Sequence, residues 1–243
     1  MDGLDVEALV GGIDDYVAEL LDSLALTAPP FEPRTAARRL GFEVLTDASQ
    51  GGRGRHVRLA GRTVLVVKPE DRPERSAWTL AHELGEALMA DLVRRTGASA
   101  AVEEGRSRET VANLFATRFL LPSRPFRAAW DEFNGELPDL KQRFTNASHE
   151  LVATRWLDFS PTGIVTVFDQ GRMTRRVGAN GRRTGGLAER ERECRAAVCA
   201  ARVPARCEGE GWIVRGWAVD EPGWQREILM TEVPPEDSGD FLD

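Results

Sequence analysis

The run WTLAHELGE at residues 78–86 places one imidazole and two carboxylates within five residues, at His82, Glu83 and Glu86. Successive residues of an α-helix are rotated by about 100°, so these three side chains fall on one side of a helix. The opposite side is apolar and predicts the face that packs into the core, with Leu80, Leu84, Ala87 and Leu88. The run therefore predicts a helix that presents ionisable groups on one face.

The spacing within this run suits a metal-binding site. His82 and Glu86 are four residues apart, and side chains at that spacing lie one helical turn above each other, close enough to bind one ion. The carboxylate of Glu83 lies to the side, where it can reach a water on the ion. In an HExxH motif this arrangement supplies two ligands and a general base, and here the second ligand position holds Glu86.

A third ligand has to come from another segment. Glu109 is the candidate, because it opens the helix-like run ETVANLFA at residues 109–116. Asn113 follows one turn later on the same face, where it could orient a ligand or a substrate.

These two runs resemble the ImmA/IrrE family of zincin-like metallo-endopeptidases. Residues 78–85 are similar to that family's active-site helix, in which AHELGH is usual, and residues 109–122 are similar to its second helix. Further similar segments precede and follow the two runs, at residues 29–31, 36–41 and 148–156. The resemblance covers about residues 10–160.

The resemblance implies a role for each of these residues. His82, Glu86 and Glu109 would be the metal ligands, and Glu83 the general base. The family has histidine where this chain has Glu86, so the ligand set is one charge more negative. A more anionic set makes bound water less acidic. Zn²⁺ is the ion that the family implies, Mn²⁺ or Fe²⁺ would suit the harder ligands, and loss of the metal is the alternative.

Hydrophobic periodicity predicts an α+β fold in two parts. Helices are expected at 8–23, 35–40, 76–95 and 107–120 and two or three more within 124–159, with strands at 42–45, 57–59 and 63–67. From Gly163 the expected order is β-β-α-β-β, at 164–168, 173–177, 187–201, 211–219 and 225–233. We therefore expect a mostly helical, zincin-like peptidase domain with a small hairpin or sheet at 1–160, and a small α+β unit at 161–243.

Composition restricts the function classes. The chain has 243 residues, 42% of them hydrophobic and 29% charged, and no apolar run approaches the about 20 residues of a membrane span. The acidic N-terminus does not look like a signal peptide, so a cytoplasmic protein is expected. The three cysteines lack CxxC spacing, which argues against a disulfide framework and a cysteine zinc site. A net charge of −7 disfavours direct nucleic-acid binding.

Other features have plain structural interpretations. His149-Glu150 lacks a surrounding motif and has Ala153 at the ligand spacing, and His56 is expected to be structural or exposed. Two segments, 34–41 and 144–157, are similar to helix-turn-helix sequence but coincide with helices that the peptidase resemblance explains. An arginine cluster predicts either a solvated hairpin or a contact for an acidic partner or nucleic acid; it comprises Arg172, Arg175, Arg176, Arg182 and Arg183.

Two functions remain at this point. The resemblance implies a metal-dependent endopeptidase whose protein substrate is a specific helix-turn-helix repressor in a stress or mobile-element response. The alternative is an inactive regulator that binds such a partner without cleaving it.

Overall fold

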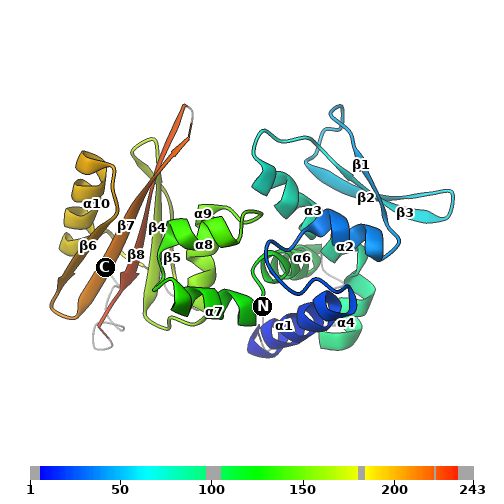
Figure 1. Ribbon diagram of the computed structural model, residues 1–243, viewed down its shortest axis with the longest axis horizontal. Helices are drawn as coiled ribbons and strands as arrows, with labels where there is room; N and C mark the ends of the chain where they lie inside the picture. Colours follow the sequence, from blue (N-terminus) through cyan, green and yellow to red (C-terminus); the bar gives the residue numbers. More distant parts are fainter. Residues whose placement is uncertain (1–5, 97–104, 180–183, 222, 235–243) are drawn as a thin grey trace. The chain divides into compact units, whose positions relative to one another are not determined.

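The computed structural model describes residues 6–96, 105–179, 184–221 and 223–234 (Figure 1). The chain divides into two compact units, Met1–Ser148 and His149–Asp243, called here the N-terminal and C-terminal units. Both combine helices with a small sheet, so the predicted α+β class is confirmed. No helix among the described residues has the length and apolar character that crossing a membrane requires.

The N-terminal unit is mostly helical. Its three-stranded sheet has the order β1-β3-β2, with β1 parallel to β3 and β2 antiparallel to it. The strands are β1 (Glu43–Thr46), β2 (Gly54–Leu59) and β3 (Arg62–Val67). The helices that precede the candidate site are α1 (Val6–Ser23) and α2 (Pro33–Arg39), and those that form or follow it are α3 (Pro73–Ala87), α4 (Met89–Thr96), α6 (Gly105–Leu120), α7 (Ser123–Glu132) and α8 (Leu137–Arg143).

Helix α3 differs in two ways from the helix predicted at 76–95. It begins at Pro73, not at a Ser76 N-cap, because proline fits the first turn, where its missing N–H costs nothing. It ends at Leu88, whose φ of −92° and ψ of 6° leave the helical region, and α4 continues as a separate helix. The side that carries the ionisable groups is also largely buried, including Thr79 and Glu83, since α3 packs against both β2 and β3.

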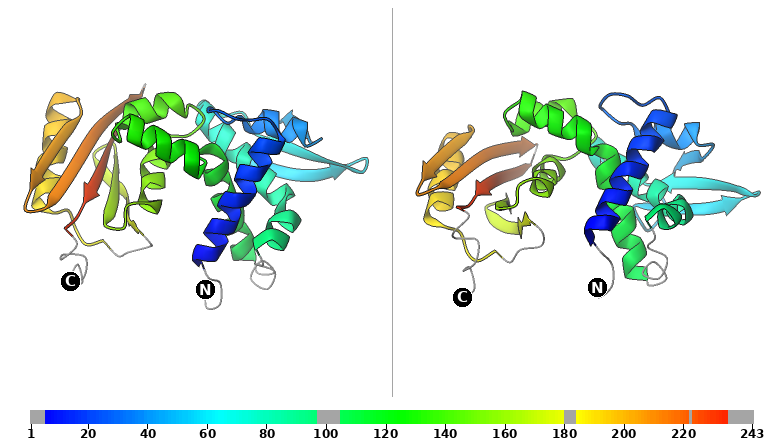
Figure 2. Two further views of the ribbon diagram at one scale, coloured as in Figure 1. Left: turned by 60° about the horizontal axis from the view of Figure 1, so that its bottom comes forward. Right: turned by 90° about the horizontal axis from the view of Figure 1, so that it is seen from below.

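Helix α6 is the central helix of this unit. It packs along α3 and also contacts α1 and α4, which lie beside it in Figure 2. Its apolar face is fully covered, at Val111, Ala112, Phe115, Ala116, Phe119 and Leu120. The position of Glu109 is therefore fixed by a helix that is anchored along its length.

The C-terminal unit is built on a five-stranded antiparallel sheet with the order β5-β4-β8-β7-β6. Helix α10 packs against β6, β7 and β8, and α9 packs against β4 and β8. Its elements are α9 (His149–Arg155), η1 (Trp156–Asp158), β4 (Gly163–Asp169), β5 (Arg172–Gly178), α10 (Glu189–Ala201), β6 (Ala205–Gly209), β7 (Trp212–Glu221) and β8 (Trp224–Glu232). The sequence analysis missed β6, a half-exposed edge strand with few apolar residues.

Among the described members of the predicted arginine cluster, Arg172 and Arg175 are exposed and the Arg176 side chain is buried. Arg176 makes a buried ion pair with Glu191, whose carboxylate also accepts hydrogen bonds from Thr231 and from the Ala188 backbone. Arg175 pairs with Glu150 on α9. Arg172 is exposed, and Arg182 and Arg183 lie outside the described residues. Of the described arginines, Arg176 therefore has a structural role in the C-terminal unit.

The domain boundary expected at residues 160 and 161 stays a prediction. Packing divides the chain between Ser148 and His149, because α9 contacts β4 and β8 of the C-terminal sheet.

Candidate metal centre

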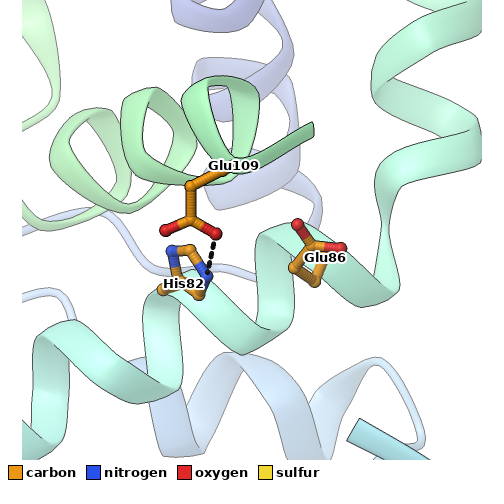
Figure 3. Close-up of side chains that lie close together, drawn as sticks. All are labelled: His82, Glu86 and Glu109. Carbon is orange, nitrogen blue, oxygen red and sulfur yellow. Dashed lines mark ion pairs between the residues drawn. The ribbon is translucent and has the colours of Figure 1, made fainter. Parts of the chain in front are cut away.

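Two helices bring His82 and Glu109 face to face (Figure 3). His82 Nε2 on α3 lies 3.7 Å from Glu109 Oε2 on α6. Glu86, one turn after His82 on α3, joins them: one ligand atom from each of the three residues lies within 4.8 Å of those of the other two. The three candidate ligands that the sequence spacing indicated are therefore neighbours in the fold.

A glycine allows the two helices to approach each other at this point. A Cβ added at Gly85 would lie 2.8 Å from Cδ1 of Phe115, closer than real Cβ contacts come. Gly85 and Phe115 are both buried. Because Gly85 lies between His82 and Glu86 in the sequence, the close contact sets the distance from both side chains to α6.

The distances between the donor atoms suit one bound cation. The 3.7 Å between His82 Nε2 and Glu109 Oε2 is too long for a hydrogen bond. It is shorter than the roughly 4.2 Å that two metal–ligand bonds of about 2.1 Å can span. One imidazole nitrogen and two carboxylate oxygens suit Zn²⁺, Mn²⁺ or Fe²⁺.

Asn113 fixes the orientation of two of these side chains. Its Nδ2 donates to Glu109 Oε1 at 3.4 Å, and its Oδ1 lies 3.0 Å from His82 Nδ1. In the tautomer with its proton on Nδ1, His82 donates to this oxygen and presents the Nε2 lone pair toward Glu109. Trp78 stacks on the imidazole with 5.3 Å between ring centroids. Metal-binding histidines in proteins are commonly oriented through their second nitrogen in this way.

Glu86 has a cationic neighbour on the opposite helix. Arg108 Nη2 donates to Glu86 Oε2 at 3.0 Å. Arg108 is adjacent in sequence to Glu109, so α6 supplies both a carboxylate and a guanidinium to this cluster. The carboxylate at the second ligand position is therefore already engaged in an ion pair.

The side chain of Glu83 extends from α3 toward strand β2. Its Oε2 is 3.6 Å from His56 Nδ1 on β2, and a Cβ added at Gly54 would lie 2.6 Å from its Oε1. Burial raises the pKa of Glu83, which the charges of His82 and His56 partly oppose. A general base works best when its pKa approaches the working pH, so the direction of this shift suits that role.

Part of the chain matches the model of a known protein family. Residues 37–157, about half of the chain, match the model of the IrrE N-terminal-like domain, a peptidase family. Through this segment, the chain belongs to the family of IrrE N-terminal-like domains.

The fold also matches a solved structure that extends beyond the IrrE N-terminal-like domain. A Mycobacterium tuberculosis transcriptional regulator is similar over 95% of this chain and 80% of its own, with a TM-score of 0.67 and 20% identity. Likeness at this identity concerns the fold. No curated protein matches the chain.

Three neighbours of the candidate site residues in the IrrE N-terminal-like domain were not predicted from the sequence: Trp78 and Arg108, which contact candidate ligands, and His56, which contacts Glu83. Trp78 stands four residues before His82, which is a usable signal for contact on a helix. Arg108 gave no separate signal, because its contact with Glu86 depends on how α6 lies against α3. His56 was expected to be structural or exposed; its side chain is 39% exposed and contacts Glu83.

Proposed function

We propose that this chain is a metal-dependent endopeptidase. The convergence of His82, Glu86 and Glu109 from two helices, with Glu83 next to His82, is the observation that carries the proposal. The match to a peptidase family supports it. The cofactor is a divalent transition metal, with Zn²⁺ first and Mn²⁺ or Fe²⁺ as alternatives that suit two carboxylate ligands.

His82, Glu86 and Glu109 would hold the ion, which when bound acts as a Lewis acid toward a peptide carbonyl and lowers the pKa of water. Asn113 and Trp78 keep the His82 imidazole in one orientation. Glu83 takes a proton from the attacking water and delivers it to the leaving amide nitrogen.

The substrate in this proposal is a specific helix-turn-helix repressor, the partner class that resemblance to ImmA/IrrE peptidases implies. Cleavage of such a repressor would release the genes that it controls.

The test combines metal analysis with cleavage of a candidate repressor by purified full-length protein. Wild type should contain one ion per chain and cut the repressor, whereas Glu83→Gln should keep the ion and lose at least 100-fold in cleavage rate, a loss on the order of that expected without general acid–base catalysis. Glu132→Gln, a neutralised carboxylate elsewhere in the N-terminal unit, should cleave like wild type. Equal cleavage by wild type and Glu83→Gln would contradict the proposal.

A second candidate function is favoured by the Glu86–Arg108 ion pair. An ion pair at the second ligand position is compatible with a regulator that binds the repressor without cutting it. Tight repressor binding by protein treated with a chelator, with no cleavage on addition of Zn²⁺ or Mn²⁺, would favour this function over the peptidase.

A further inference from the structure

The three candidate ligands and Arg108 lie close enough together for their charges to be considered as one sum. Replacing histidine by glutamate at the second ligand position adds one negative charge to the three ligands. The Arg108 guanidinium, 3.0 Å from the Glu86 carboxylate, supplies one positive charge on the opposite helix. The formal charge of the four groups therefore equals that of two histidines and one glutamate.

We propose that Arg108 compensates the charge of Glu86 and competes with the divalent cation for its carboxylate. This inference rests on the proposed metal site and assigns a positioning role to a residue outside the ligand set. Arg108 lowers the affinity of the site for the ion, because it offsets part of the negative charge that the Glu86 carboxylate presents to the ion.

The competition follows from the donor geometry. Glu86 Oε2 accepts the hydrogen bond from Arg108, so a cation that binds Glu86 either shares this carboxylate with the guanidinium or displaces it. Sharing leaves a monovalent cation a few ångströms from a divalent one, and displacement breaks the charge-assisted hydrogen bond. Both costs weaken binding of the ion.

Exposure sets the size of the effect. The side chain of Glu86 is 15% exposed but that of Arg108 is 44% exposed, so solvent screens the pair and its contribution is modest. We expect removal of the guanidinium to tighten binding by about twofold to fivefold, the range of an ion pair of this exposure.

The experiment is calorimetric titration of full-length protein with MnCl₂ and with ZnCl₂ after chelator treatment, at about 0.15 M salt, where remote charges are screened. The variant is Arg108→Gln, which keeps most of the side-chain length. The matched control is Arg143→Gln, because Arg143 also pairs with a carboxylate, Glu132, at 3.0 Å in the same unit. His82→Ala identifies binding elsewhere on the chain, including at cysteines.

Arg108→Gln should bind both ions more tightly than wild type and Arg143→Gln. In a Glu86→His background, where no carboxylate remains at position 86, the same substitution should change affinity by less than twofold. Binding by Arg108→Gln but not by wild type would also support the inference.

Equal or weaker binding by Arg108→Gln would overturn the role of Arg108 and leave the metal site intact. Binding in no variant, or binding that His82→Ala does not reduce, would instead contradict the metal site itself, and the inference with it. Circular dichroism of each variant distinguishes lost folding from lost binding.

Discussion

Asn113 links two candidate ligands that come from different helices. Its amide contacts His82 Nδ1 and Glu109 Oε1 at once, so the position of each ligand depends on the other through one side chain. Groups that orient ligands in this way typically change metal affinity by about 10–100-fold when removed.

Asn113→Leu, which preserves most of the volume and removes both polar contacts, should weaken Mn²⁺ and Zn²⁺ binding by about 10- to 100-fold. Calorimetric titration measures the change. Thr117→Val serves as the control. Thr117 lies one turn further along α6, and its hydroxyl donates to the backbone carbonyl of Asn113 and does not contact a candidate ligand. Unchanged affinity in Asn113→Leu would show that the amide does not orient the ligands.

The site residues differ in how far sequence alone could identify them. His82, Glu86 and Glu109 were predicted as ligands because helical spacing puts the first two on one face and a second motif supplies the third, and the three lie close together in the structure. Asn113 followed from the same periodicity. Arg108 and His56 make their contacts across element boundaries, α6 to α3 and β2 to α3, and no periodicity within one element contains that information.

At the scale of elements, the contact between α3 and α6 determines the site. These two helices pack together more extensively than any other helix pair described for the chain, and Gly85 is where a side chain would separate them.

Gly85→Ala should therefore destabilise the N-terminal unit by about 1–3 kcal/mol, the usual cost of overpacking, and weaken metal binding. Gly11→Ala is the control: Gly11 lies within α1 with no atom near the added Cβ. There the substitution should stabilise by roughly 0.5–1 kcal/mol, because alanine favours the helix. Urea unfolding gives both free energies, and the same sign for both variants would refute the close-contact argument.

Helices and strands were predicted correctly where the hydrophobic residues of a segment follow one clear periodicity. They were predicted wrongly where tertiary contacts determine the bounds of an element. Helix α6 and the hairpin of β2 and β3 lie where the sequence indicated, with the turn at Ala60 and Gly61. The helix predicted at 76–95 is divided at Leu88, and no proline or glycine in the sequence marks that position. The exposed alternate residues of β6 give no apolar run to detect.

At the scale of the whole molecule, the candidate metal centre and the main polar clusters of the C-terminal unit are in different units. The ligands lie in the N-terminal unit. In the C-terminal unit Asp169 accepts hydrogen bonds from Thr174, Trp224 and Arg226. Burial alone raises the pKa of Asp169, but these donors and the Arg226 charge outweigh burial and hold the pKa below its ordinary value.

A depressed carboxyl pKa stabilises the folded state above the ordinary aspartate pKa, and that contribution is lost as pH falls through the folded-state pKa. Asp169→Asn should thus lower the free energy of unfolding of the C-terminal unit by about 1–2 kcal/mol at neutral pH. The difference from wild type should shrink below about pH 4. Denaturant unfolding at several pH values, monitored by hydrogen exchange of the backbone amides of β4 and β8, measures this difference in the free energy of unfolding.

The same variant should bind Mn²⁺ as wild type does, because every described partner of Asp169 belongs to the C-terminal unit. A pH-independent difference in stability would show that the charge of Asp169 is not the stabilising feature.

The pair of helices that carries the candidate ligands is held together by buried apolar contact at Gly85 and Phe115. Side chains on the polar side of this contact should therefore tolerate substitution without unfolding the two helices. We expect Glu86→His, for example, to change the ligand set and leave the two helices folded.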